Sequence, residues 1–560
     1  MDMNDKYEIV VQNPVLPGFH PDPSICKVGD YYYIATSTFE YFPGVAIHKS
    51  RNLQDWTICP NALRRKNQLN MDGNPSSGGI WAPCLTHDKG TFYLIYTDVK
   101  EWLGALNTQG FKDSHNYLTT APSIEGPWSD PVYLNSSGFD PSLFHDEDGR
   151  KWFVNMIWDY RNWENNFGGI VLQEFDEENG CLTGPIENIF RGTDLKLTEA
   201  PHLYKRNGFY YLMTAEGGTS YFHAVTLARS RNINGPYEVH PDKHLLTAVS
   251  DRPALEKALS TNDFKNASSA LHPGLQKAGH GSMVPWTDDE WILAHLCGRP
   301  LENTGRCPLG RETALQKIVW KEDDWPYLDG KGASETVHFP QKKNIRPIEK
   351  NRELVSWIEN FDRNKWDYQL NTLRNPSGDN YLLNERPGWL RLNGAESPVS
   401  RFNQTLLVRR VQHFNWSVET RLDFSPDDFQ QFAGLIVRYD ETTQLIFRVS
   451  DNYGVRSLGI ISYDLNQQDL PLGRDEIALD DGPVSLRVYV SGRDLQFSYS
   501  QNSSSWKKVG PVFDSSIFSD DYVNPMGFTG TYAGLGAWDV SGRRKSADFE
   551  YLKYNQEVVI

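Results

Sequence analysis

Acidic side chains recur at matched places in a segment that the first half of the chain repeats five times. Two copies open with aspartate, DPSICKVGDYYYI from Asp22 and DPSLFHDEDGRKWFV from Asp140, and a third, APHLYKRNGFYYLM, is preceded by Glu199. The copies APCLTHDKGTFYLIY and HGSMVPWTDDEWILAH complete the set, the last without its proline. Aligned in register, the copies place one residue each at a common level: Asp22, Ala82, Asp140, Ala200 and His280.

Carboxyl groups that converge beside aromatic rings suit the hydrolysis of glycosidic bonds. Trp81 and Glu199 stand immediately before the common level, so three acids and an indole would meet if the copies surround one axis. A single aspartate before proline more often caps a turn, but like charges gathered at an axis are costly unless function retains them. In glycoside hydrolysis one protonated acid assists the departing oxygen while an ionised one activates water. A third carboxylate beside the acid would raise its pKa and keep it protonated near neutral pH.

The elements that must position these residues are short strands joined by tight turns. Each copy passes through a polar turn into a strand rich in aromatic residues. Four of these turns carry residue types that accept positive φ: Gly29-Asp30, Lys89-Gly90, Asp148-Gly149 and Asn207-Gly208. Several copies close on a second aromatic hairpin, at Trp56, Trp128 and Tyr237, and helical periodicity is nearly absent. Strands in groups of four that recur about every 60 residues are typical of a β-propeller, and five copies predict five blades.

The repeat ends after Trp325, and the remaining chain follows a different pattern. The stretch 342–352 is rich in lysine, asparagine and proline and is interpreted as a linker. From about Trp357 the strands become longer and alternate with a period of two, as in VSLRVYVSGRDLQFSYS. This alternation is typical of a β-sandwich. The sequence therefore predicts an all-β chain with a five-bladed propeller over 10–340 and a β-sandwich over 353–560.

The composition argues against several classes of protein. The chain of 560 residues is 39% hydrophobic and carries a formal charge of −16 with no block of lysine and arginine, so no nucleic-acid partner is expected. No stretch approaches the roughly 20 apolar residues of a membrane helix, and MDMNDKYEIVVQNP lacks the pattern of a secretory leader. The six cysteines show no metal-ligand spacing and are interpreted as reduced, mostly buried thiols. We therefore expect a cytoplasmic protein without a membrane partner.

Longer motifs connect this pattern to a known family. The chain resembles glycoside hydrolase family 43, and specifically its two-domain β-xylosidases, along nearly its whole length. The matching segments are NPVLPGFHPDPSI, STFEYFPGVAIHKS, GNPSSGGIWAP, LNSSGFDPSLFHDEDG, GTDLKLTEAPHLYK, LMTAEGG, CPLGRETALQ, RPGWLRL, FQQFAGL and FTGTYAG. The resemblance implies a concanavalin-like jelly roll as the sandwich. It also implies a homo-oligomer, because members of the family form dimers and tetramers.

The activity implied by the resemblance is that of an inverting exo-glycosidase. Such an enzyme releases xylose from the non-reducing end of β-1,4-xylo-oligosaccharides, and α-L-arabinofuranosidase side activity fits because the two sugars present similar hydroxyl geometry. Carried over residue by residue, Asp22 would be the general base, Glu199 the general acid, and Asp140 the residue that positions the acid and modulates its pKa. Inversion requires the base and the acid to stand roughly 6.5–9.5 Å apart with water between them.

The resemblance also implies residues that bind the substrate. Arg311 of CPLGRET would bind sugar hydroxyls, while Phe39 and Trp81 would form the wall of the pocket. A loop of the sandwich would close the pocket through FTGTYAG and its Tyr532. His280 matches the family's axial histidine, which can lie beside a bound calcium ion or a water cluster, although the reaction itself requires no cofactor.

The sequence departs from the family pattern at two places. Two alternative functions are also left open. Ala200 follows the acid where the family usually has glycine, and 250–272 has the character of an insertion before LQKAGH. One alternative is a dedicated α-L-arabinofuranosidase or arabinan hydrolase on the same propeller. The other is a catalytically silent carbohydrate-binding protein that uses its sandwich. The presence of all three acids and of Arg311 favours an enzyme.

Overall fold

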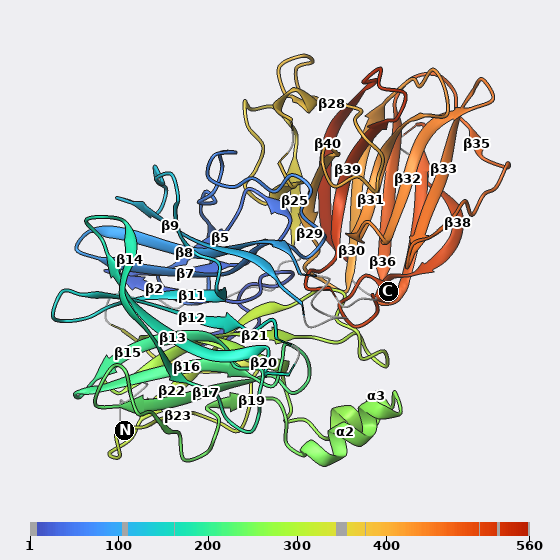
Figure 1. Ribbon diagram of the computed structural model, residues 1–560. Coiled ribbons are helices and arrows are strands. Elements are labelled where there is room, and N and C mark those ends of the chain that lie inside the picture. The colour runs from blue at the N-terminus through green and yellow to red at the C-terminus, as the bar shows by residue number, and fades with distance from the viewer. Residues whose placement is uncertain are drawn as a thin grey trace, which may run out of the picture.

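The computed structural model describes residues 8–102, 110–161, 163–342, 355–375, 377–502, 505–523 and 527–557, and within them the chain is almost entirely β-structure. Two lobes lie side by side, one from the N-terminal half of the chain and one from the C-terminal half (Figure 1). Most of the linker predicted at 342–352 lies outside the described residues. Among the residues that the structure describes, no helix has the length and apolar character that crossing a membrane requires.

The N-terminal lobe consists of five antiparallel sheets. The first three are β2 (Ser24–Val28), β3 (Tyr31–Thr36), β5 (Ala46–Ser50) and β6 (Thr57–Ile58); β7 (Gly79–Asp88), β8 (Thr91–Glu101), β9 (Asp113–Ala121) and β10 (Val132–Asn135); and β11 (Gly138–His145), β12 (Lys151–Trp158), β13 (Phe167–Asp176) and β14 (Cys181–Phe190). The last two are β15 (Glu199–Arg206), β16 (Phe209–Glu216), β17 (Ala224–Ser230), β18 (Glu238–Val239) and β19 (Leu246–Thr247); and β20 (Gln276–Pro285), β21 (Glu290–Gly298), β22 (Glu312–Trp320) and β23 (Pro326–Leu328).

The first strands of the five sheets form a closed ring. Strand β2 contacts β7 and β20, β11 contacts β7 and β15, and β15 contacts β20. The ring is completed at the chain ends, where β1 (Glu8–Gln12) pairs antiparallel with β24 (Thr336–Pro340). This arrangement is a five-bladed propeller whose innermost strands line the axis, which confirms the prediction.

Aromatic side chains of the second and third strands fill the spaces between blades. The ring of Tyr33 on β3 meets that of Phe92 on β8 edge-on at 5.6 Å, and Tyr211 on β16 meets Trp320 on β22 at 4.9 Å. Rings at such distances and angles add to the stabilisation that comes from burying their apolar area. The aromatic strands that reveal the repeat in the sequence therefore hold neighbouring blades together.

The C-terminal lobe consists of two facing sheets. The larger runs β34 (Gln467–Asp469), β33 (Val455–Asp464), β32 (Thr443–Asn452), β31 (Gln431–Asp440), β39 (Tyr532–Asp539), β29 (Thr405–Arg410), β26 (Leu370–Leu373) and β4 (Tyr41–Phe42), with β35 (Ile477–Ala478) beside β33. The other runs β27 (Tyr381–Leu382), β28 (Leu390–Asn393), β40 (Ser546–Gln556), β30 (Asn415–Asp423), β36 (Val484–Ser491), β37 (Asp494–Ser500) and β38 (Lys507–Asp514), with β25 (Ser356–Glu359) beside β40. Buried side chains of both sheets form one core, so this lobe is the predicted sandwich.

The two lobes share a sheet. Strand β4 belongs in sequence to the first blade, yet it pairs with β26 of the sandwich through Phe42 and Thr372. Side chains reinforce the junction: Arg410 Nε donates to the carbonyl of Phe19 at 2.7 Å, and Arg374 Nε donates to that of Asn74 at 2.7 Å. Because backbone pairing crosses the junction, the sandwich is held at a fixed position beside the propeller.

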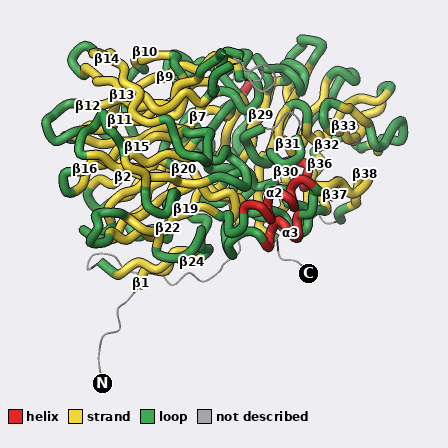
Figure 2. The backbone as a smooth tube through the Cα atoms, turned by 60° about the horizontal axis from the view of Figure 1, so that its bottom comes forward, coloured by secondary structure: helices red, strands yellow, loops and turns green. Residues whose placement is uncertain are grey.

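The stretch 250–272 forms a pair of short helices, α2 (Arg252–Ser260) and α3 (Phe264–Ser269), coloured red in Figure 2. Asp251 and Asp263 cap their N-termini by accepting from backbone amides. Leu255 and Ala258 are buried in the core cluster shared with the fourth and fifth blades. The insertion therefore packs against the propeller as a helical hairpin, which the sequence pattern did not indicate.

Candidate active site

The five matched positions of the repeat share an unusual backbone conformation. Their φ angles are all positive: 55° at Asp22, 34° at Ala82, 54° at Asp140, 53° at Ala200 and 45° at His280. L-residues other than glycine seldom adopt this left-handed region. Strand pairing shifts register beside four of these positions, which marks β-bulges there. The repeated bulge explains why equivalent side chains from separate blades turn toward one place.

A cavity of about 270 Å³ lies where the matched residues meet. All three predicted acids line it and are buried, with 5% of Asp22, 7% of Asp140 and 7% of Glu199 exposed. Its other lining residues include Phe39, Trp81, Lys112, Phe139, Trp158, Phe167, His280, Arg311 and Phe528. The structure therefore brings together the predicted Asp22, Asp140, Glu199, Arg311, Phe39, Trp81 and His280, with Tyr532 absent from this set.

The carboxylate of Asp22 is held from several sides. The hydroxyl of Ser37 donates to Oδ2 at 2.6 Å and itself accepts from the amide of Ala82 at 2.7 Å. On the other oxygen, Oδ1, Arg311 Nη1 lies at 3.4 Å and His280 Nδ1 at 3.6 Å. These contacts fix the orientation of the carboxylate, as a base that must aim a water molecule requires.

Asp140 and Glu199 form a pair of interacting buried acids. Burial first, and then the charge of Asp22, raise the pKa of Glu199, while Arg311 and Lys112 act in the opposite direction. Burial and the charges of Glu199 and Asp22 raise the pKa of Asp140 well above its usual range. The amide of Ala200 donates to Asp140 Oδ2 at 3.1 Å and favours its ionised form. A carboxyl group whose pKa is raised in this way keeps its proton closer to neutral pH, as a general acid requires.

One wall of the cavity is aromatic and is contributed by both domains. Phe528 of the sandwich packs against Trp81 at a ring distance of 5.5 Å and against Phe39 at 6.1 Å. Ser77 connects Trp81 of the propeller to Phe528 of the sandwich. Its carbonyl accepts a hydrogen bond from Trp81 Nε1 at 2.8 Å, and its hydroxyl accepts one from the amide of Phe528 at 2.9 Å. The predicted closing segment FTGTYAG thus reaches the cavity through its first residue.

Tyr532 does not line the cavity, which corrects the prediction for this residue. It is fully buried at the domain junction, where its ring stacks on Tyr41 at 3.7 Å and meets Phe19 edge-on at 6.1 Å. The reason is its place in the fold: Tyr532 begins β39, a central strand of the larger sandwich sheet, so its ring is fixed against the propeller. Phe528 precedes that strand and is the residue that reaches the site.

Arg311 links the propeller acids to the sandwich. Its Nη2 donates to the carbonyl of Phe528 at 2.9 Å, and its Nε lies 3.7 Å from Asp520 Oδ2. Asp520 also accepts a hydrogen bond from the hydroxyl of Tyr439. Burial raises the pKa of Asp520 to about 7, against the opposing effects of Arg311 and Tyr439. Sequence reasoning missed Asp520, because the segment SDDY around it carries no repeat or motif.

Lys112 is a second residue that the sequence did not reveal. Its Nζ lies over the rings of Trp158 at 4.5 Å, Trp81 at 5.7 Å and Phe139 at 5.9 Å. Burial lowers the pKa of Lys112 to about 8, although the charge of Glu199 opposes this shift. A cation held over aromatic rings beside an acid can tune that acid's proton affinity.

The protein groups around His280 offer few of the oxygen ligands that calcium prefers. Calcium prefers six to eight oxygen atoms, whereas His280 offers a ring nitrogen and its carboxylate neighbour, Asp22, is already engaged by Arg311 and Ser37. Among the described residues, no group of three or more His, Cys, Asp or Glu side chains has the arrangement of a metal site. Burial lowers the pKa of His280. A calcium ion beside His280 therefore stays an expectation from the family resemblance.

Buried acids, an arginine and an aromatic wall at the axis of a propeller define the class of this protein as a glycoside hydrolase. A family model described as "Glycosyl hydrolases family 43" matches residues 11–326, and one described as "Beta xylosidase C-terminal Concanavalin A-like domain" matches residues 358–555. The chain therefore belongs to glycoside hydrolase family 43. The second match also confirms that the sandwich is concanavalin-like.

Individual relatives are similar over their whole length. A protein named "Xylosidase/arabinosidase 43B" from Humicola insolens is 48% identical over 97% of both chains. A "Beta-xylosidase" from Bacillus subtilis (strain 168) is 44% identical, covering 98% of this chain and all of the relative. The crystal structure of a xylan β-1,4-xylosidase from Bacillus halodurans C-125 superposes with a TM-score of 0.89 at 48% identity, covering 98% of this chain and 100% of the other.

Proposed function

We propose that the chain is an exo-acting β-xylosidase that releases xylose from the non-reducing end of β-1,4-xylo-oligosaccharides with inversion. The observation that carries this proposal is the axial cavity of about 270 Å³, in which three buried acids face an aromatic wall completed by the sandwich. A small cavity bounded in this way suits one terminal sugar residue better than the middle of a chain. The names of the similar proteins support xylose as that residue.

The roles proposed for the acids follow from their surroundings. Glu199, whose pKa is raised by burial and by the charge of Asp22, would keep its proton and donate it to the departing glycosidic oxygen. Asp22, oriented by Ser37 and Arg311, would remove a proton from the water that attacks the anomeric carbon. Asp140 would position Glu199 and modulate its pKa. With base and acid on opposite sides of the sugar, the product has the inverted configuration.

The anomeric signals of the first product test this proposal. Purified protein is mixed with xylobiose and followed by proton NMR from the earliest minutes. Early α-xylose would support hydrolysis with inversion and a water between Asp22 and Glu199. Early β-xylose would overturn the mechanism. Calorimetric binding of xylobiose without turnover would instead favour a carbohydrate-binding protein.

A second activity on α-L-arabinofuranosides is favoured by one comparison. The 48% identical relative from Humicola insolens carries both xylosidase and arabinosidase in its name. The rates of hydrolysis of nitrophenyl xyloside and nitrophenyl arabinofuranoside, measured side by side, separate the two functions. We expect the xyloside to be cleaved faster; a strong preference for the arabinoside would assign the chain as an arabinofuranosidase.

The substrate partner in this proposal is a short xylo-oligosaccharide, and no cofactor is required.

We further propose that the chain forms a homo-oligomer, a dimer or a tetramer. Light scattering on the purified protein tests the assembly: a mass of two or four times 64.0 kDa is expected, and a monomer would contradict it.

A further inference from the structure

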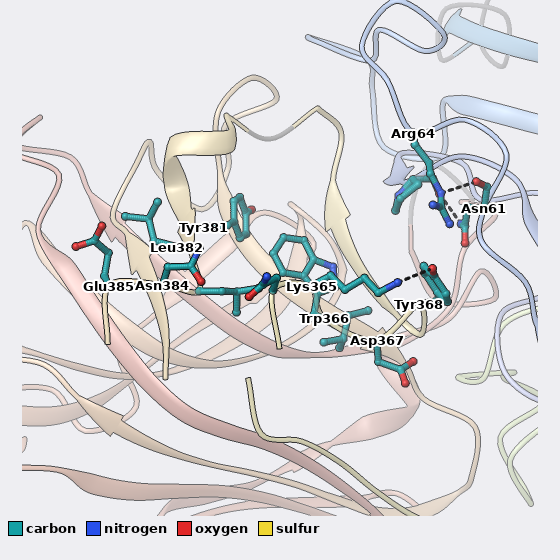
Figure 3. Close-up of a pocket in the computed structure, with 14 residues that line it drawn as sticks. Asn61, Arg64, Lys365, Trp366, Asp367, Tyr368, Tyr381, Leu382, Asn384 and Glu385 are labelled. Atoms are coloured by element: carbon teal, nitrogen blue, oxygen red, sulfur yellow. Dashed lines mark hydrogen bonds between the residues drawn. The ribbon is translucent and has the colours of Figure 1, made fainter. Parts of the chain in front are cut away.

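A second and larger cavity, of about 530 Å³, lies at the junction of the two domains. It shares no lining residue with the axial cavity. Figure 3 shows that Asn61 and Arg64 enter it from the propeller, while Trp366, Tyr368 and Asn384 come from the sandwich. Its volume falls within the range of sites that hold small molecules. None of the catalytic roles proposed above uses it.

Aromatic side chains form one part of this junction cavity. Trp366 packs on the sandwich core beside Tyr381, at a ring distance of 5.7 Å, and stays partly exposed. Tyr368, two residues further along, is held by Arg64 of the propeller, whose guanidinium lies 5.0 Å from the ring centre, and by Lys365, whose Nζ lies 3.3 Å from its hydroxyl. The sandwich thus presents partly exposed aromatic surface, which Arg64 of the propeller helps to hold in place.

Polar groups complete the cavity. Asn384 and Glu385 are exposed, and neither forms a side-chain hydrogen bond that is seen within the described part of the chain, so both can bind a ligand. One carboxylate oxygen of Asp367 accepts a hydrogen bond from the backbone amide of Gln369 at 2.8 Å. The lining residues include two basic side chains, Arg64 and Lys365, and two acidic ones, Asp367 and Glu385.

The balance of these groups selects a class of ligand. Opposite charges in equal number favour neither an anion nor a cation. Aromatic rings next to amide and carboxylate groups match a molecule with flat apolar faces and a hydroxyl rim, because each hydroxyl needs a partner once it leaves water. Pyranose sugars have this character: their C–H faces pack on rings while their hydroxyls bond to side chains such as Asn384 and Glu385.

We propose that the junction cavity is a second, non-catalytic binding site for neutral oligosaccharides. The identity of the sugar, a xylo-oligosaccharide, rests on the proposed function; the existence of the site rests on Trp366, Tyr368, Asn384 and Glu385. Because Arg64 and Tyr368 contact each other across the junction, a bound sugar would touch both domains. The site would retain a longer chain on the enzyme surface while a terminal residue is cleaved at the axis.

Calorimetric stoichiometry tests this site. Glu199→Gln, which removes the general acid, is titrated with xylohexaose so that binding is observed without turnover. We expect two binding events per chain. Adding Asn384→Ala and Glu385→Ala should remove the second event or weaken its Kd at least tenfold, while leaving the first unchanged. A matched control changes another exposed amide and acid of the sandwich, Gln467→Ala and Asp469→Ala, and should retain both events.

The remaining outcomes decide the proposal. A single binding event in Glu199→Gln itself would overturn the proposal, as would a second event that Asn384→Ala and Glu385→Ala leave unchanged. Equal losses in the control pair would overturn it as well. Trp366→Ala, checked for an unchanged cooperative melting transition, should weaken the second event as well. Hydrolysis of xylobiose by the wild-type chain is measured in parallel. If that reaction fails while the second event remains, the proposed function is wrong and the junction site stands.

Discussion

Arg311 of the propeller and Asp520 of the sandwich face each other across the domain junction, with Nε 3.7 Å from Oδ2. The same guanidinium contacts the carboxylate of Asp22 at 3.4 Å through Nη1. Asp520 of the sandwich therefore helps to position Arg311, and Arg311 orients Asp22, the proposed base in the propeller. This contact gives the sandwich a second role at the site beyond closing the cavity with Phe528.

Asp520→Asn should lower activity through Arg311. An amide keeps the shape of the side chain but cannot pair with a guanidinium ion, so Arg311 loses one of its anchors. We expect kcat/KM on xylobiose to fall by about 10- to 100-fold, which corresponds to about 1.4–2.7 kcal/mol. The neighbouring Asp521 is a matched control, because it contacts Lys277 and the amide of Cys307 instead of Arg311. Equal losses in Asp521→Asn would assign the effect to the junction as a whole.

Glu199→Ala should discriminate between leaving groups. A general acid matters most when the departing oxygen is a poor leaving group, and it contributes roughly 10²–10⁴-fold to the rate. We therefore expect a loss of this size on xylobiose and a much smaller loss on an aryl xyloside with an acidic phenol. Steady-state kinetics on both substrates measure the difference. Equal losses on the two substrates would contradict the acid assignment.

Lys112→Met should move the alkaline limb of the pH profile. The charge of Lys112 lowers the pKa of Glu199, so removing that charge raises the pKa. The acid would then keep its proton to higher pH, and the fall of kcat/KM in alkali would begin at higher pH than in the wild type. Lys257→Met, which removes an exposed lysine of α2, is the control and should leave the limb in place. A shift toward lower pH in Lys112→Met would exclude this coupling.

The sequence predicted the residues that belong to the repeat. Asp22, Asp140 and Glu199 could be aligned because each blade repeats a residue with positive φ at the same place. This repetition leaves a recurring sequence pattern, which surrounds a proline in four of the five copies. Because the blades form a closed ring, residues at equivalent positions of the repeat lie close together in space. The fold and the convergence of the three acids at the axis were therefore predictable from the sequence alone, whereas their catalytic roles stay predictions.

Residues from irregular loops were not predictable in the same way. Asp520 and Lys112 lie outside the repeated strands, and the place of Asp520 depends on how the two domains pack. The segment FTGTYAG was identified correctly, but the choice of Tyr532 over Phe528 required knowing where β39 begins. The helices α2 and α3 are too short for their periodicity to stand out.

Removal of metal ions should leave activity unchanged. The proposed chemistry uses side chains alone, and the surroundings of His280 offer few of the oxygen atoms that calcium takes. We expect the same kcat on xylobiose before and after dialysis against EDTA. A loss of activity that added calcium restores would contradict this prediction and place a functional ion near the axis.

Phe528→Ala and Tyr532→Phe together test how the sandwich completes the site. Phe528 closes the aromatic wall, so its removal opens the cavity to water and takes away apolar contact with the bound sugar. We expect kcat/KM to fall about tenfold or more, near 1.4 kcal/mol, mainly through a higher KM. Tyr532→Phe should have near wild-type kinetics, because the ring stays stacked on Tyr41 and the buried hydroxyl has no hydrogen-bond partner among the described residues. The opposite order of effects would restore Tyr532 as the substrate contact.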